Sequence, residues 1–207
     1  MMDPTFLISA FVTLFVVIDP IGLTPLFIAL TQGADARHRR AVGIRATVIA
    51  AALLTLFAFF GEAVLGFIGI GMPAFRISGG ILLFITALDM LFERRNKRRE
   101  DRAEADHPPD PSVFPLAIPL IAGPGAIASM ILLTGSTTDV LGIIGVLGVM
   151  ALVLALVLLL FLSAGLIERG LGPTGITVTT RLLGMLLAAL SVQFVLDGLR
   201  DFGFVAS

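Results

Sequence analysis

The stretch IDPIGLTP, residues 18–25, interrupts an apolar run that otherwise extends over residues 5–30. It places one carboxylate, two prolines and one glycine within eight residues. Proline lacks a backbone N–H and clashes with the carbonyl one turn earlier, and glycine weakens the interior of a helix. A helix that only crosses a bilayer needs none of these residues. We therefore expect the first apolar segment to be broken here.

The composition of the whole chain favours a polytopic membrane protein. Its 207 residues are 57% hydrophobic and the mean hydropathy is +1.04, whereas soluble domains are about 45–50% apolar. Apolar runs of about 18 residues or more recur along the chain, which is the length that crosses a bilayer as a helix. The first segment has no basic residue before it and no small-residue cleavage pattern, so we expect a retained helix and not a signal peptide.

Several classes of protein lack the residues they need in this sequence. Cysteine is absent, which excludes thiol chemistry, disulfides and cysteine-ligated metals. The net charge of −1 provides no basic field for nucleic acid. His38 and His107 both fall in predicted loops, and neither an H-E-x-x-H helix nor a G-x-x-x-x-G-K-S/T loop occurs. We therefore expect no enzyme activity, no cofactor, no metal, no nucleic-acid partner and no ATP-driven transport.

Hydropathy predicts six membrane spans. They lie near residues 5–30, 43–67, 74–92, 113–135, 140–165 and 178–199. The loops after the first, third and fifth spans, with the adjoining span ends, hold eleven of the 14 Lys and Arg residues. The positive-inside rule places these loops in the cytoplasm and both termini on the opposite side.

The two halves of the chain resemble each other. The segments FRISGGILLF, from Phe75, and TRLLGMLLAA, from Thr180, both place Arg-x-x-Gly at the head of a predicted helix, 105 residues apart. Pro20 in IDPIG and Pro124 in IAGPGAI are 104 residues apart. The agreement of the two offsets indicates an internal repeat.

The repeat must be inverted, because a unit of three spans begins on one side of the membrane and ends on the other. We therefore predict an all-α membrane protein of six transmembrane helices, arranged as two inverted three-helix repeats with broken helices 1 and 4. Residues 1–92 would form the first repeat, residues 93–112 a cytoplasmic linker and residues 113–207 the second repeat. Inverted repeats with interrupted helices at matching places are typical of secondary transporters.

The two breaks are expected to meet near the middle of the bilayer. Their freed backbone groups cannot face lipid, where each unsatisfied group costs several kcal/mol, so they need a cavity or a tightly packed polar seam. Half-helices that begin near Thr24–Pro25 and near Pro124 would direct their positive ends there, which suits a carboxylate or another anion. The candidate substrate-binding residues are Asp19, Pro20, Gly22, Thr24, Pro25, Thr86, Gly123, Pro124, Gly125 and Gln193.

Asp19 and Gln193 each have two interpretations. Asp19 could bind a substrate ammonium group or carry a coupling proton, or it could cap the second half-helix. Gln193 could line the site or form a hydrogen bond between helices. The sequence does not separate these roles.

Other residues within the spans have structural interpretations. Arg76 heads the third span, and its position favours a side chain that reaches the headgroups. Asp197 and Arg200 are three residues apart near the end of the sixth span, which predicts a pair on one helix face. Gly80 and Gly184 lie where small residues permit close contact between helices.

The motifs resemble the MarC family of bacterial inner-membrane proteins, which includes the SnatA type of small neutral amino acid transporter and is related to the LysE exporter superfamily. The resemblance rests on IDPIGLTPLF, FRISGGILLFITALDMLF, PLIAGPGAI and RLLGMLLAALSVQFVLDGL, and it covers essentially the whole chain. It implies six helices, a bacterial inner (plasma) membrane location with periplasmic termini, and small-molecule transport. The first break of the family usually reads Asp-Pro-x-Gly-Asn-x-Pro. Leu23 replaces the Asn here, which is compatible with a more apolar substrate or with lost activity.

The favoured hypothesis is a secondary transporter or exporter of small metabolites such as amino acids, driven by an ion gradient that could be a proton gradient. The alternative is a non-transporting membrane assembly or structural protein, which predicts a sealed centre with the breaks packed against each other. Besides the substrate and the lipid bilayer, a second copy of the chain in a homo-oligomer is a compatible partner.

Overall fold

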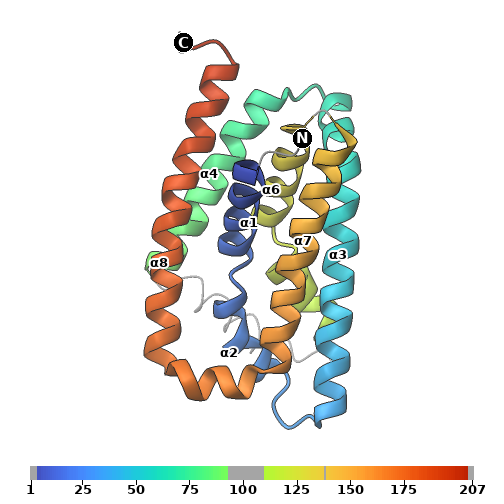
Figure 1. Ribbon diagram of the computed structural model, residues 1–207, viewed down its shortest axis with the longest axis vertical. Helices are drawn as coiled ribbons and strands as arrows, with labels where there is room; N and C mark the ends of the chain where they lie inside the picture. The colour runs from blue at the N-terminus through green and yellow to red at the C-terminus, as the bar shows by residue number, and fades with distance from the viewer. Residues whose placement is uncertain (1–3, 93–109, 138, 205–207) are drawn as a thin grey trace.

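The computed structural model describes residues 4–92, 110–137 and 139–204, and the regular structure within these ranges is helical. Figure 1 shows the helices as a bundle whose long members run roughly along one axis. The all-α fold prediction is confirmed. The helices are α1 (Pro4–Ile18), α2 (Pro20–Leu30), α3 (Ala36–Phe67), α4 (Met72–Leu91), η1 (Ser112–Ile121), α6 (Pro124–Gly135), α7 (Val140–Leu162) and α8 (Ala164–Asp201).

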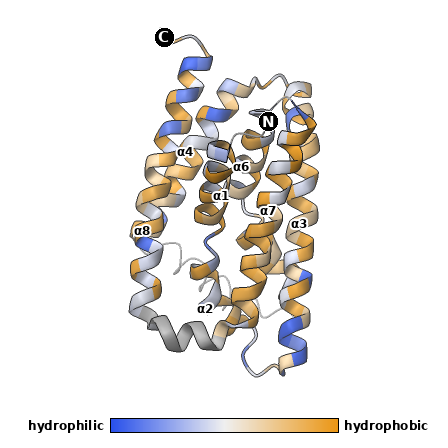
Figure 2. Cartoon of the chain, in the orientation of Figure 1, coloured by the Kyte–Doolittle hydropathy of each residue, from blue (hydrophilic) through white to orange (hydrophobic). Residues whose placement is uncertain are grey.

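Within the described residues, five segments are long and apolar enough to cross a membrane as helices, and a bent pair of helices gives a sixth when the pair is counted as one span. Their order along the chain agrees with the six predicted spans. Figure 2 shows apolar residues along most of their length, with hydrophilic residues at the lower end of α3 and the upper end of α8. The five segments are Pro4–Leu30, Ala36–Phe67, Met72–Leu91, Val140–Leu162 and Thr174–Asp201, and the pair, bent by 55°, is Ser112–Ile121 with Pro124–Gly135.

Helices of the two halves run in opposite directions. In Figure 1, α1 with α2 descends, α3 ascends and α4 descends, whereas η1 with α6 ascends, α7 descends and α8 ascends. An inverted repeat requires this reversal. Most of the predicted linker, including His107, lies outside the described residues, so the division into two repeats stays a prediction.

The first span lies at the centre of the bundle. Its apolar window is 56% buried, against 22–39% for the other four segments. Helix α1 packs on α6, α7 and α8, and α2 packs on α7 and α8. Phe27 of α2 stacks on Phe161 of α7 with ring centroids 4.2 Å apart. The break between α1 and α2 is therefore placed among helices of the second half.

Helices α4 and α8, the third spans of the two halves, form an extensive antiparallel pair. A Cβ added at Gly80 would lie 2.8 Å from the carbonyl oxygen of Ser191, and one at Gly184 would lie 2.9 Å from Met90 Cβ. Gly198 contacts α4 in the same way. In a bilayer, close packing drives helix association, and small residues permit it. The predicted close contact at Gly80 and Gly184 is confirmed.

Helix α8 begins earlier than the predicted sixth span. The region predicted as a loop after the fifth span is helical from Ala164, and the chain turns at Gly172, where φ is 62° and ψ is 174°. Glycine adopts this conformation without a steric cost. Figure 1 shows the first part of α8 crossing the lower end of the bundle before the long part ascends.

Candidate functional site at the two helix breaks

The first break consists of one residue. Asp19 has left-handed backbone angles, φ 57° and ψ 65°, which Asp tolerates better than most residues. Its N–H still bonds the carbonyl of Phe15 at 2.9 Å, and its carbonyl accepts from the N–H of Leu23 at 3.0 Å. Helix α2 therefore begins at Pro20. The sequence-based prediction placed its start too late, near Thr24. The reason is that Pro20 suits a first helical position, where no N–H donor is needed.

The Asp19 side chain caps α2. Its Oδ1 accepts a hydrogen bond from the N–H of Gly22 at 3.0 Å, and the residue is fully buried. A Cβ added at Gly22 would lie 2.1 Å from Asp19 Oδ2. Glycine at this position leaves the space into which the carboxylate folds. Of the two interpretations of Asp19, the cap is observed, and the proton or substrate role stays a prediction.

The first turns of α2, next to the break, are also packed into the bundle. The Thr24 hydroxyl donates to the carbonyl of Pro20 at 3.0 Å. Pro25 lies inside α2, and its missing N–H removes the usual helical donor to the carbonyl one turn earlier. Leu23 is fully buried, so it places an apolar group in the core beside the break.

The second break is longer and less regular. In η1, Phe114 and Ile118 have extended backbone angles (φ −125°, ψ 127° and φ −127°, ψ 125°), and each precedes a proline, which disfavours the helical region. Helix α6 begins at Pro124, as predicted, after Gly123, which provides no side-chain cap. The first N–H groups of a helix have no acceptor within the helix, and proline has no N–H at all. At this helix end, the N–H groups without such an acceptor therefore belong to Gly125 and the residue after it.

The two breaks lie side by side. A Cβ added at Gly125 would be 3.2 Å from Val17 Cγ1 and 3.9 Å from Thr86 Oγ1. Val17 stands two residues before Asp19, and α1 packs on α6. The structure thus brings Gly125, the first break and Thr86 together, as the sequence suggested, while their role in substrate binding stays a prediction.

A buried hydroxyl that the sequence reasoning missed lies next to the breaks. Ser129 is on α6, one turn beyond Gly125 and on the same face, and is fully buried. Its Oγ has no hydrogen-bond partner among the described residues. Because α1 and α6 run in opposite directions (Figure 1), the buried Thr13, one turn before Val17, is at the same level. The sequence did contain a signal for this residue, because Ser129 is a polar residue inside a predicted span and lies on the same helix face as Gly125.

Comparison with known proteins places the chain in one family. A family model described as "MarC family integral membrane protein" matches residues 4–202. The chain belongs to the MarC family. It is 38% identical to a UPF0056 membrane protein of Archaeoglobus fulgidus over 95% of this chain and 93% of the relative. It is 34% identical to the UPF0056 inner membrane protein YhgN of Escherichia coli K12, over 94% and 96% of the two chains. No solved structure matches it.

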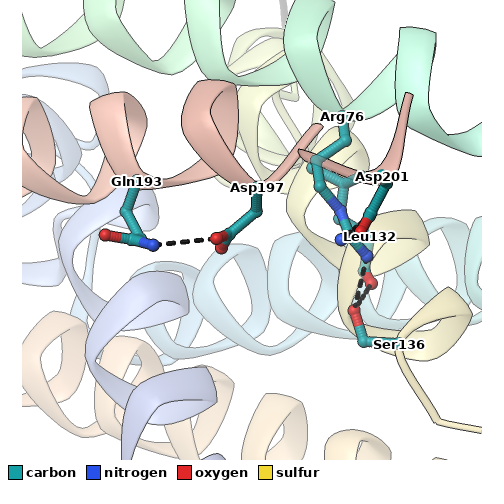
Figure 3. Close-up of polar contacts among 6 residues, drawn as sticks. All are labelled: Arg76, Leu132, Ser136, Gln193, Asp197 and Asp201. Carbon is teal, nitrogen blue, oxygen red and sulfur yellow. Dashed lines mark hydrogen bonds and ion pairs between the residues drawn. The ribbon is translucent and has the colours of Figure 1, made fainter. Parts of the chain in front are cut away.

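In this MarC family protein, Gln193 does not lie with the buried residues around the two helix breaks. It is exposed on α8, and its Nε2 donates to Asp197 Oδ1 at 2.8 Å (Figure 3). Asp197, for which the spacing predicts Arg200 as a partner, thus accepts from Gln193 instead. The pair is one helical turn long and lies on the outer face of the MarC bundle.

Arg76 joins three helices at the end of the bundle where α6 stops. It forms an ion pair with Asp201 of α8, and its Nη2 donates to Ser136 Oγ at 3.3 Å. The Ser136 hydroxyl donates to the carbonyl of Leu132 at 2.6 Å, and Figure 3 shows this chain of contacts. Arg76 therefore has specific partners in addition to any reach toward the headgroups.

Toward the opposite end, an ion pair ties the residues just before η1 to the first third of α3. Arg45 Nη1 lies 2.6 Å from Asp110 Oδ2. The pKa of Asp110 is lowered from its ordinary value of 3.8, chiefly by hydrogen bonding from Ser112; burial opposes this shift, and the Arg45 charge adds to it. Within the described part of the MarC chain, no group of three His, Asp or Glu residues is arranged to hold a metal ion.

Proposed function

We propose that this MarC family protein is a secondary transporter or exporter of small metabolites such as amino acids, with its substrate site at the two helix breaks. One observation carries the proposal: the interrupted first helix and the interrupted fourth helix lie against each other, with Gly125 beside Val17 and Thr86. Broken helices expose backbone polar groups, which membrane proteins tolerate only within protein or beside a wet path. Secondary transporters build their sites in this way.

The chemistry around the breaks suits a small zwitterion with an apolar side chain. The N-terminus of α6, which has no side-chain cap at Gly123, favours a carboxylate through its backbone N–H groups and helix dipole. The hydroxyls of Thr86 and Ser129 are on the adjacent helix faces. Val17 and Leu23 are buried apolar neighbours in the first span, and they favour a small apolar side chain over a polar one.

Membership of the family supports a location in the cytoplasmic membrane. The relative YhgN of Escherichia coli is named an inner membrane protein. The predicted orientation, with both termini outside, follows from the basic loops. We include this location and orientation in the proposal.

The second candidate is a membrane assembly or structural protein with a sealed centre. Burial favours it, because Asp19, Leu23 and Thr24 are fully buried and the Asp19 carboxylate serves as a cap. A transporter closed to both sides of the membrane has the same buried site. The two candidates therefore differ in whether the breaks ever open to water.

Thiol labelling tests whether the breaks open. The chain has no cysteine, so Ser129→Cys introduces a single thiol beside the breaks with little change in volume. We expect a small, membrane-impermeant thiol reagent to modify it in native membranes. The matched control is Ala50→Cys, which is equally buried on α3 and should stay unmodified. Equal protection of both cysteines would favour the sealed structural protein.

Flux measurements test transport directly. Purified protein in proteoliposomes should move at least one member of a panel of small amino acids along an imposed ion gradient. Asp19→Asn keeps a capping acceptor and tolerates the left-handed backbone but removes the charge. If Asp19 carries the coupling proton, this variant loses the pH dependence of flux. Absence of flux for the whole panel in the wild-type protein, with or without a pH gradient, would overturn the proposal.

A further inference from the structure

Helix α8 packs on α4 through one face whose small groups recur every seventh residue. Gly184, Ser191 and Gly198 all contact α4 along this line. When two helices pack along their length, residues that recur every seven positions stay on the packing face. The face of α8 that points away from α4 is thereby fixed as well.

That outward face also has a heptad pattern, with seam residues separated alternately by four and three positions. All six are exposed, and the leucines among them are 51–58% exposed. We call this set the outer stripe. It consists of Leu182, Leu186, Ala189, Gln193, Leu196 and Arg200.

One member of the outer stripe, Gln193, is polar and lies at a depth where lipid tails are expected. Gln193 precedes Asp201, the last residue of α8, by eight positions, which is about 12 Å along a helix axis. An amide has two N–H donors and an acceptor oxygen. The bond from Gln193 to Asp197 (Figure 3) therefore leaves an N–H and the oxygen available. Such groups are costly against hydrocarbon unless another polar group meets them.

On α7, and on α3 between Val48 and Phe60, the exposed residues are apolar, although α3 also exposes Arg45 and Glu62 nearer its ends. On α3 the exposed residues include Val48, Leu56 and Phe60, and on α7 they include Leu152 and Leu159. These side chains carry no polar atoms and suit contact with lipid tails. The outer stripe of α8 combines an apolar seam with hydrogen-bonding groups, which suits contact with protein.

We propose that the outer stripe of α8 binds the outer stripe of a second copy of this chain, about a two-fold axis normal to the membrane. Two copies inserted with the same topology present α8 in parallel, so each seam residue meets its own counterpart. An amide at Gln193 is self-complementary because it both donates and accepts. The two Arg200 side chains would also meet in this pairing, and the Asp197 carboxylates, one turn earlier on each helix, offset their like charge. A single polar residue in an apolar heptad seam fixes register and a two-stranded pairing.

Disulfide cross-linking in native membranes tests the pairing, because the wild-type chain has no cysteine and gives no background. Ala189→Cys and Leu196→Cys place one thiol each in the seam, and mild oxidation should convert both variants to a dimer. Val48→Cys on α3, where Val48 is 60% exposed, is the control for chance collisions and should stay monomeric. All three positions are exposed, so the substitutions leave the packing within one copy intact.

The polar residue gives a second measurement. Gln193→Leu should lower the association constant of the dimer by about 3- to 10-fold, as judged from measured interhelical hydrogen bonds in membranes, in a fluorescence dilution assay in liposomes. Leu159→Ala on α7 is the control and should leave the constant unchanged. Equal cross-linking at Val48→Cys, no dimer from either seam cysteine, or a cross-link to a different protein would each overturn the proposal. These readouts do not involve transport, so they stand or fall separately from the proposed function.

Discussion

The substitution Gly22→Ala tests the packing of the first break. The structure attributes the pattern Asp-x-x-Gly to a carboxylate that folds over the first turn of α2. A Cβ at residue 22 would lie 2.1 Å from Asp19 Oδ2 and 2.8 Å from Asp19 Cγ. No pair of unbonded atoms of these types comes so close, so the carboxylate must move away. Since Asp19 is fully buried, the movement breaks its bond to the Gly22 N–H.

The expected cost follows from the interactions that are lost. Removal of an N-terminal cap costs about 1–2 kcal/mol. Polar groups left buried without their partner add about 1–3 kcal/mol. Alanine is up to about 1 kcal/mol better than glycine in a helix, which offsets part of the loss. We therefore expect Gly22→Ala to lower the free energy of unfolding by about 1–4 kcal/mol.

Equilibrium unfolding by a denaturing detergent in mixed micelles measures this difference. The matched control is Gly148→Ala on α7, where an added Cβ has no atom within 4 Å. That variant should be unchanged or up to about 1 kcal/mol more stable. Asp19→Gly supplies a second background, because it removes the carboxylate and suits the left-handed backbone. In that background Gly22→Ala should no longer destabilise the protein.

Two results would refute this reasoning. The first is a Gly22→Ala protein as stable as the wild type. The second is a loss of stability that persists undiminished in the Asp19→Gly background, because the double-mutant cycle would then show no coupling between the two positions. In either case the glycine would be required for a reason other than the Asp19 side chain.

Three further predictions concern the contacts that hold the bundle together. Gly80→Ala should lower the free energy of unfolding by about 1–3 kcal/mol, because the new Cβ would lie 2.8 Å from a backbone carbonyl of α8 that cannot move alone. Arg76→Gln should cost about 0–1 kcal/mol, because its partner Asp201 has a side chain that is 43% exposed. Asp110→Asn should reduce stability at neutral pH, where the carboxylate is charged and paired with Arg45. Its lowered pKa means that this contribution is present above pH 3.8 and is lost as pH falls through the lower folded value.

The same unfolding titration checks all three. Gly66→Ala on α3, where an added Cβ meets nothing within 4 Å, is the control for Gly80→Ala, and equal effects of the two would contradict the close α4–α8 contact. A large loss in Arg76→Gln would mean that the three-helix contact is more tightly coupled than its exposure indicates. A stability difference between Asp110→Asn and the wild type that does not shrink as the pH falls through the lowered pKa of Asp110 would contradict the assigned ion pair.

Local residue chemistry was enough to predict much of this protein. Hydropathy located the five long apolar helices and the bent pair, because it sums over about twenty residues and needs no knowledge of neighbours. Proline and glycine located both breaks, since their effects on the backbone act within one turn. The start of α6 at Pro124 was correct for this reason. The start of α2 was placed a few residues too late, because the left-handed turn at Asp19 confines the break to one residue.

Tertiary structure alone decided which faces are buried and which residues meet. A membrane helix is apolar on both its protein-facing and its lipid-facing sides, so hydrophobic periodicity does not separate inside from outside. The depth of Gln193 in its span was readable from sequence, but its position on the outer face of α8 depends on Gly184 and Gly198 packing against α4. In the same way, the approach of Gly125 to Val17 joins residues more than a hundred positions apart. Contacts between helices, and not the local chain, fix such distances.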